Sequence, residues 1–180
     1  DTTSADGNPI GQKYTDPAGA VPINHLFIHD TSINMRRRRR ISIMQSSIRS
    51  VLNEAKPTSY AGLRLFGHRF PVDGPDACED TELILPPGPI LTNREDFDLQ
   101  LNLLSNPVIG GGAPVGLALQ ESIADLRDFE GQKEIYLYLV DLIKCASPDP
   151  IQIIRSACEV SDLHLTLIGF GLRSDLQILE

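Results

Sequence analysis

One stretch near the start of the chain constrains the fold more than any other. The residues from Ile23 to His29 are mainly apolar, with three consecutive apolar residues from Leu26 to Ile28, and the run ends abruptly at Asp30. Such a run is typical of a strand buried at the centre of a sheet. Oxygen-bearing side chains then occupy alternate positions, namely Asp30, Ser32 and Asn34. Open α/β sheets bind ligands at the carboxyl ends of their strands, and oxygen ligands suit a hard cation such as Mg2+ or Ca2+.

Strand-like and helix-like patterns alternate along the rest of the chain. A helix is expected from Ile41, because apolar residues recur at helical spacing up to residue 55. The segment 81–85, bounded by Pro86, follows the strand at 61–67 too closely for a parallel crossover. These two strands are therefore expected to form an antiparallel hairpin. Further strands are expected at residues 134–140 and 163–168, and further helices from near Thr92, Pro114, Asp149 and Ser174.

This alternation predicts an α/β fold with a doubly wound, Rossmann-like sheet. The sheet is expected to be mostly parallel with one antiparallel edge strand, and helices should cover both faces. Residues 1–21 are rich in Gly, Pro, Ser, Thr and Asp without periodicity, so we interpret them as a linker or arm. Residues 22–180 are expected to form one domain, whose last helix is truncated.

The charge of the chain is acidic, with one concentrated basic segment. The net charge is −8 although the run 36–40 adds five positive charges, so the remainder carries −13 (−8 − 5). This distribution argues against a general nucleic-acid-binding surface. No apolar run reaches the ~18 residues that a membrane span needs. The sequence lacks an initiator Met and a signal-peptide pattern, so we interpret it as part of a longer parent chain with other domains.

Three motifs together resemble those of von Willebrand factor type A domains. The stretch 30–35, Asp-x-Ser-x-Asn-Met, resembles the family's Asp-x-Ser-x-Ser-Met motif. The segment 111–119 (GGAPVGLAL) resembles its Gly-Gly-Thr-Pro-Leu…Ala-Leu segment, and residues 140–142 (VDL) resemble its Thr-Asp-Gly. Three further segments are similar to bacterial members: 78–83 (CEDTEL), 142–150 (LIKCASPDP) and 168–171 (IGFG).

The resemblance implies a metal-ion-dependent adhesion site at the rim of the sheet. Ser32 and Asn34 would ligate the ion directly, whereas Asp30 and Asp141 would act mainly through bound waters. An acidic side chain of another protein would complete the coordination. The resemblance therefore implies a non-enzymatic protein-binding module, with an adhesion or scaffold role.

Three residues depart from the family's pattern at this site. Ala113 replaces the expected Thr, Asn34 replaces the second Ser, and Leu142 replaces the Gly. Fewer protein oxygens should lower the affinity for Mg2+ or Ca2+. Two interpretations remain open. The site binds a divalent cation weakly, or it binds none, and Asp30 and Asp141 are satisfied by loop amides, helix starts or arginines. In the second case the domain is a metal-independent structural or regulatory one.

The arginine run offers a second way to bind an acidic partner. Five consecutive helical residues sweep about 400°, so they cannot share one face, and the helix is expected to begin near Arg39 or Arg40. Arginine binds carboxylates and phosphates in bidentate geometry, which suits an acidic protein segment. The alternative is a solvated turn whose arginines pair with nearby acids, namely Asp30, Glu79, Asp80 or Asp141. The run consists of Arg36, Arg37, Arg38, Arg39 and Arg40.

Enzymatic alternatives fit the motifs less well. A phosphatase of the haloacid-dehalogenase type would use Asp30, but it needs a second Asp where Ser32 stands. A triad of Ser32, Asp30 and His29 would draw on neighbours in one segment, which cannot converge on one proton path. The glycines at 110–112 match neither G-x-G-x-x-G nor a P-loop. We therefore expect no enzyme, and a phosphatase-like activity is the least favoured alternative.

Cysteine placement bears on the compartment. The loops that carry Cys78 and Cys145 should lie at the same rim, so these residues can form a disulfide in an oxidising compartment. Cys158 is expected to remain a free thiol in the core. This favours a periplasmic or extracellular location over a cytoplasmic one. The four histidines are expected to pack in or beside strands, each with one satisfied nitrogen.

Overall fold

The computed structural model describes residues 21–36, 39–104, 111–140, 145, 147–159 and 162–171. Its centre is a five-stranded sheet with the strand order β3-β2-β1-β4-β5. The β1, β2, β4 and β5 strands run parallel, and β3 pairs antiparallel with β2. This confirms the mostly parallel sheet with one antiparallel edge strand. The strands are β1 (Ile23–Asp30), β2 (Tyr60–Phe66), β3 (Thr81–Pro89), β4 (Gln132–Leu139) and β5 (Leu163–Gly169).

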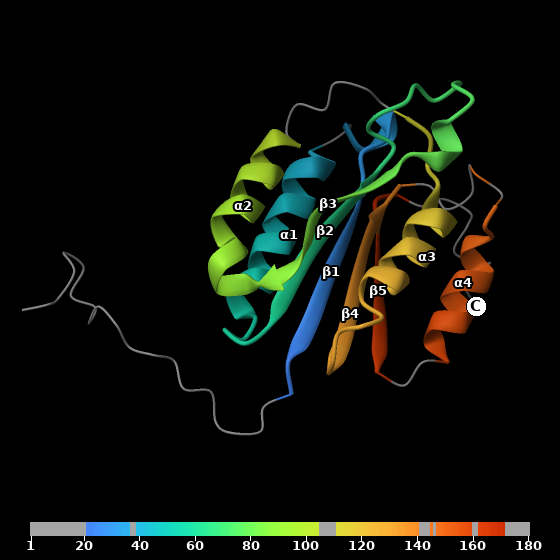
Figure 1. Ribbon diagram of the computed structural model, residues 1–180. Helices are drawn as coiled ribbons and strands as arrows, with labels where there is room; N and C mark the ends of the chain where they lie inside the picture. The colour runs from blue at the N-terminus through green and yellow to red at the C-terminus, as the bar shows by residue number, and fades with distance from the viewer. Residues whose placement is uncertain are drawn as a thin grey trace, which may run out of the picture.

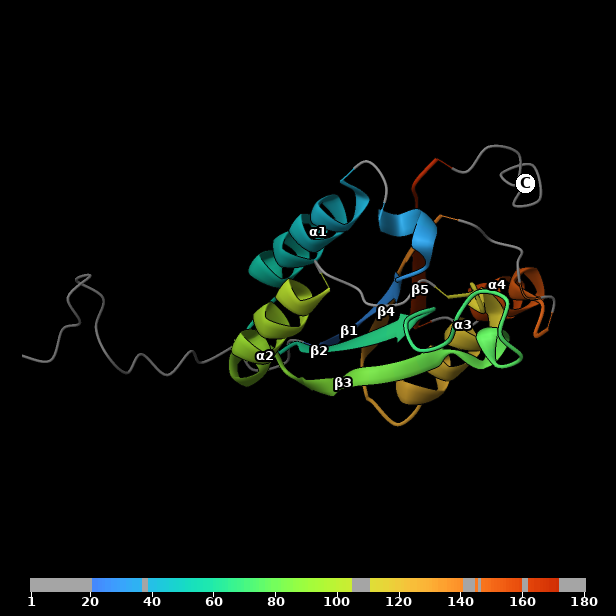
Figure 2. The same cartoon turned by 90° about the horizontal axis from the view of Figure 1, so that it is seen from above.

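Helices cover both faces of this sheet, as the alternation predicted. Figures 1 and 2 show α1 and α2 on one face and α3 and α4 on the other. Two short 3-10 helices, η1 (Ile33–Arg36) and η2 (Ala77–Glu79), follow β1 and precede β3. No helix among the described residues is long and apolar enough to cross a membrane. The α-helices are α1 (Arg40–Glu54), α2 (Ile90–Leu103), α3 (Val115–Asp125) and α4 (Pro150–Cys158).

The central β1 strand is buried on both faces, which explains the consecutive apolar residues at its centre. Leu26 and Ile28 pack in the cluster beneath α3 and α4. Phe27, which lies between them in the sequence, packs in the opposite cluster beneath α1 and α2. Side chains alternate between the faces of a strand, so a strand between two helical layers carries apolar side chains on both faces.

Two predicted boundaries are wrong, both at the β3 edge. The β3 strand continues to Pro89 instead of ending before Pro86. An edge strand tolerates proline because its outer N–H groups need no partner, and the pairing with β2 shifts register near Leu63. The α2 helix begins at Ile90, with Pro89 in the cap position, instead of near Thr92. The arm before residue 21 and the helix expected from Ser174 lie outside the described residues.

Candidate functional site

The carboxyl end of β1 is tied to both neighbouring strands. The fully buried Asp30 carboxylate accepts the backbone N–H of Ser32 through Oδ1 at 2.7 Å. Its Oδ2 accepts the N–H of Val140, directly after β4, at 3.1 Å. On the other side, the Thr31 hydroxyl donates to the Phe66 carbonyl at the end of β2, at 2.5 Å. These bonds fix the backbone on which the predicted ligands lie.

Ser32 is the most informative of these predicted ligands. The residue is 1% exposed, and its hydroxyl has no hydrogen-bond partner within the described chain. Buried hydroxyls are nearly always hydrogen-bonded, and each exception calls for an explanation such as an ion or a water molecule. Asn34 follows in η1 and is half-buried. Ser32 therefore has a free oxygen lone pair at the rim where a ligand is expected.

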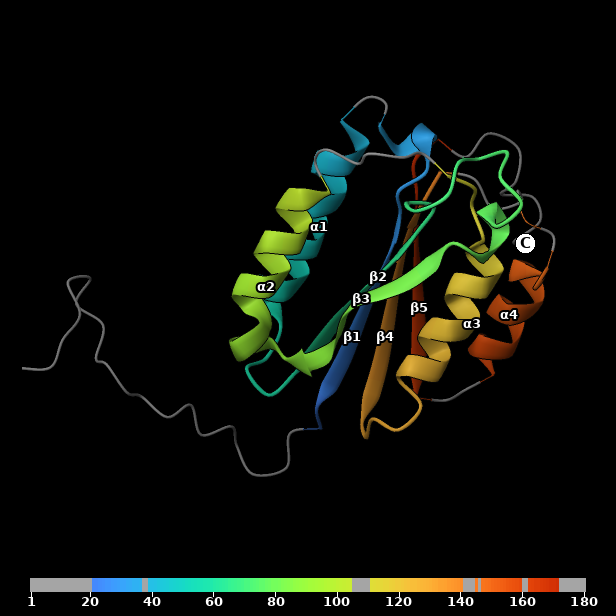
Figure 3. The same ribbon diagram turned by 45° about the horizontal axis from the view of Figure 1, so that its top comes forward.

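Glycines bring the segment 111–113 against this rim. The Gly111 N–H donates to the Gly67 carbonyl at 2.9 Å. Gly67 has a φ of +72°, and a Cβ there would lie 2.4 Å from the Gly112 carbonyl oxygen and 3.4 Å from the Ser32 nitrogen. Figure 3 shows the loop after β2 and the segment leading into α3 meeting η1 at the top of the sheet. Only glycine allows these backbones to approach so closely.

The described residues of the predicted cation site lie at this rim. Asp30 and Ser32 lie at the rim, and Ala113 joins it from the α3 side, where it is 1% exposed and packs in the apolar cluster. Asp141 lies outside the described residues. Among those that are described, no three His, Cys, Asp or Glu side chains gather closely enough to hold a metal ion. A cation here would therefore depend on hydroxyl, amide and water oxygens.

The α1 helix begins at Arg40, the last residue of the arginine run, as predicted. Arg39 occupies the helix cap in a left-handed conformation, with a φ of 60°, and is exposed. The Arg40 guanidinium donates from Nη1 to the Asn34 carbonyl at 2.8 Å. This contact places one arginine directly beside the predicted ligands. Arg37, Arg38 and the side chain of Arg36 lie outside the described part of the chain.

The loop between β2 and β3 at this rim depends on an aspartate whose structural role the sequence did not indicate. Asp80 is fully buried, and its Oδ2 accepts the backbone N–H groups of Arg69 at 2.7 Å and Phe70 at 3.1 Å. Its Oδ1 accepts Arg69 Nε at 3.0 Å. This one carboxylate therefore orders the loop between β2 and β3. The only available signal was an acid placed directly before a strand in a glycine-rich and proline-rich loop.

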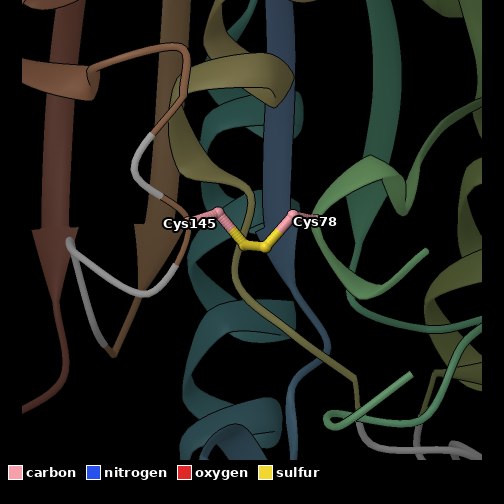
Figure 4. The surroundings of a disulfide bond; sticks show 2 residues. All are labelled: Cys78 and Cys145. Carbon is pink, nitrogen blue, oxygen red and sulfur yellow. A yellow bond between two sulfur atoms is a disulfide. The ribbon is translucent and has the colours of Figure 1, made fainter. Parts of the chain in front are cut away.

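A disulfide joins that loop to the chain after β4. Cys78 and Cys145 are bonded, the pairing that the sequence permitted (Figure 4). The bond links η2 with the segment before α4. The side chain of Cys158 lies outside the described residues, so its expected free thiol stays a prediction.

The expectation of one satisfied nitrogen per histidine is wrong for the two in β1. His25 is 5% exposed and His29 is fully buried, and neither has a ring-nitrogen partner among the described residues. Both rings lie on a strand whose backbone groups are used by the sheet, and His25 stacks on Phe27 and Tyr136. Burial lowers the pKa of His29 to about 3 and also lowers the pKa of His25. Both imidazoles are therefore neutral near pH 7.

The described residues form a doubly wound α/β sheet, and open sheets of this kind bind ligands at the carboxyl ends of their strands. No protein-family model and no curated protein sequence matches the chain. Solved structures are more informative, and they show that the chain has the fold of a von Willebrand factor type A domain. Similarity at this level of identity establishes the fold alone.

Three of these structures illustrate the similarity. A von Willebrand factor type A protein from Catenulispora acidiphila aligns with a TM-score of 0.61 and 11% identity, over 83% of this chain and 33% of that one. The pilus adhesin SpaC from Lactobacillus rhamnosus GG aligns with a TM-score of 0.59 and 13% identity, over 83% of this chain and 24% of that one. Proximal thread matrix protein 1 from the mussel byssus aligns with a TM-score of 0.55 and 15% identity, over 83% of this chain and 37% of that one. The chain thus corresponds to between 24% and 37% of these proteins.

Proposed function

We propose that this domain is a non-enzymatic protein-binding module that binds an acidic group of its partner at the carboxyl-end rim of the sheet. A weakly held divalent cation would mediate the contact. The observation that carries the proposal is the Ser32 hydroxyl, which is buried at that rim without a partner in the described chain. Asp30 beside it is fixed by two backbone N–H groups.

The residues present fit a hard cation with few protein ligands. Ser32 Oγ and the Asn34 amide oxygen would hold the ion, and Asp30 would act through water. A carboxylate has about four lone-pair sites, and on Asp30 the N–H groups of Ser32 and Val140 bond to one oxygen each. Ala113 supplies no oxygen, so water must take its place and the affinity should be low. When bound, the ion would supply an open coordination position for a carboxylate of the partner.

Two proteins of similar structure agree with a binding role. SpaC is described as a pilus adhesin, and the mussel protein as a thread matrix protein. An adhesion or scaffold role is consistent with both. The disulfide supports a periplasmic or extracellular location, because such bonds persist in oxidising compartments.

The side chains at this rim are not arranged for hydrolytic catalysis. His29 and Asp30 are adjacent in β1, so their side chains point to opposite faces of the sheet. Neither ring nitrogen of His29 bonds to Ser32, whose hydroxyl lacks a partner in the described structure. A nucleophile needs a base within hydrogen-bond reach. The arrangement therefore favours binding over catalysis.

A metal-independent contact through the arginine run is the second candidate. Arg40 already lies beside the predicted ligands through its bond to the Asn34 carbonyl, and Arg39 is exposed. An acidic partner could meet this cationic edge with no cation at Ser32. Binding of this kind should weaken as salt increases.

Calorimetric titration with Mg2+, Mn2+ and Ca2+ tests the cation. We expect weak binding, in the range of about 0.1–1 mM that loosely held Ca2+ sites show, to wild type. Ser32→Ala should abolish it, and Ser50→Ala, an exposed serine whose hydroxyl bonds to Glu54, should not. Absence of heat at millimolar ion would remove the cation from the proposal.

Short peptides with a single Asp or Glu then test the partner chemistry. Binding that requires the cation and is lost in Ser32→Ala supports the proposed site. Cation-independent, salt-sensitive binding that is lost when Arg36, Arg37 and Arg38 become Gln would support the second candidate instead. If peptides with Asn or Gln in place of Asp or Glu bind as tightly as the acidic peptides, both candidate functions are contradicted.

A further inference from the structure

We propose that the Cys78–Cys145 disulfide is a positioning element of the rim, and that its reduction loosens the backbone around Ser32 and lowers the affinity of the site. The ligand-binding part rests on the proposed function, whereas the loosening of the rim does not. The bond joins two loops that are 67 residues apart in the sequence, one before β3 and one before α4.

On the Cys78 side, a chain of backbone contacts leads from the disulfide to Ser32. A Cβ on Gly112 would lie 2.7 Å from the carbonyl oxygen of Ala77, the neighbour of Cys78. A Cβ on Gly67 would lie 2.4 Å from the Gly112 oxygen and 3.4 Å from the Ser32 nitrogen. The backbones of these segments therefore approach each other closely. A shift of η2 should therefore displace Gly112, Gly67 and the Ser32 backbone in turn, because close-packed interiors transmit displacement.

On the Cys145 side, the connection runs to Asp30 and to the first turn of α3. Cys145 follows Val140 by five positions, and the Val140 N–H donates to Asp30 Oδ2 at 3.1 Å. Pro148 lies on the same connection, and a Cβ on Gly116 would be only 1.9 Å from its carbonyl oxygen. Figure 4 shows the disulfide crossing close to the segment that leads into α3. The disulfide thus joins the two loops that lie on either side of the 111–116 segment.

The exposure of the two cysteines favours reduction from one side. Cys78 is exposed, whereas Cys145 is 4% exposed. The thiolate of a dithiol reductant attacks Cys78 Sγ, which forms a mixed disulfide and releases the Cys145 thiolate to take up a proton. The second thiol of the reductant then displaces Cys78 as a thiol. Two electrons pass to the protein, and the reductant becomes a cyclic disulfide.

Amide hydrogen exchange, measured by NMR, tests the positioning role. The background is Cys158→Ala, so that no third thiol can exchange with the bond. We compare this protein with the triple variant that also carries Cys78→Ser and Cys145→Ser. The Gly111 N–H, which donates to Gly67, and the Val140 N–H should exchange at least tenfold faster in the triple variant. The Phe27 N–H at the centre of β1 should be accelerated less than these two, since it reports only the general loss of stability that removal of a disulfide causes.

Titration with Mn2+ on the same two proteins tests the effect on affinity. We expect at least fivefold weaker binding without the disulfide, and the same loss when the background protein is treated with dithiothreitol. Unchanged exchange at Gly111 and Val140 overturns the proposal, as does faster exchange with unchanged Mn2+ affinity. Acceleration at Phe27 as large as that at Gly111 and Val140 also overturns it, since it would mean a general loss of stability and no specific loosening of the rim. If the disulfide form takes up no Mn2+, the cation part of the proposed function fails, and the exchange result alone decides the positioning role.

Discussion

The carboxylate of Asp30 accepts a hydrogen bond from the backbone N–H of Val140, 110 residues further along the chain, at 3.1 Å. The same carboxylate accepts the N–H of Ser32. Asp30 therefore joins the ends of two neighbouring strands, β1 and β4, whether or not a cation is present. A residue that resembles a metal-site aspartate has a structural role of its own, and its substitution affects more than ligand binding.

Asp30→Asn tests that structural role. The variant keeps the shape of the side chain, but its amide nitrogen cannot accept an N–H, so one buried backbone donor loses its partner. We expect a loss of about 1–3 kcal/mol in the free energy of unfolding, measured by urea denaturation without added cation. Asp128→Asn, at an exposed position, should stay within about 0.5 kcal/mol of wild type. Equal stability of the two variants would refute the structural role.

The sheet could be predicted from the sequence because its strongest signals agree with one another. The apolar run before Asp30 predicts a central strand, and β1 is the middle strand of five. The short link between residues 66 and 81 predicts the antiparallel pair that β2 and β3 form. Asp149 before Pro150 predicts a helix start, and the Asp149 carboxylate does accept the Ile151 N–H at 2.9 Å. Each of these signals is local and needs no tertiary context.

Features that depend on distant neighbours could not be predicted. A proline pair usually ends a strand, but Pro86 and Pro87 lie within β3 because that strand is at the sheet edge. The environment of His29 depends on helices that close over the sheet from elsewhere in the chain. The partners of Asp80 lie 10 and 11 residues earlier, in a loop without periodicity. Asp141 lies outside the described residues, so its place in the cation site stays a prediction.

Gly67→Ala should destabilise the rim more than an ordinary glycine substitution. A left-handed φ of +72° and a contact of 2.4 Å with the Gly112 oxygen both oppose a Cβ. Backbone strain alone costs about 1–3 kcal/mol, so we expect a loss of at least 2 kcal/mol in a urea titration. The matched control is Gly74→Ala, whose Cβ would lie 3.1 Å from the Pro71 oxygen and whose φ is not positive. A smaller effect at Gly67 than at Gly74 would contradict the argument.

His29 should make the fold sensitive to mild acid. Its pKa is about 3 in the folded protein, against 6.5 as the ordinary value. Between these pH values the unfolded chain binds a proton that the folded chain does not, so stability falls as the pH drops from 6.5 towards 3. The slope approaches 1.4 kcal/mol per pH unit, which is about 2 kcal/mol lost by pH 5. His29→Phe should flatten the dependence, whereas His164→Ala, at an exposed position, should leave it unchanged. Identical slopes in all three proteins would exclude His29 as the cause.

Ala113→Thr tests whether the rim is a weakened cation site. The family's pattern has a threonine at this position, and Ala113 lies buried at the start of α3 beside the glycines that contact Gly67. One more oxygen ligand should strengthen Mn2+ or Mg2+ binding by about tenfold, equivalent to 1.4 kcal/mol. Ala113→Val adds nearly the same volume without the hydroxyl, so any effect of packing alone appears in both variants. Calorimetric affinities that rise only in the threonine variant would identify the added oxygen as a ligand. Equal affinities in the threonine and valine variants would show that no cation reaches position 113.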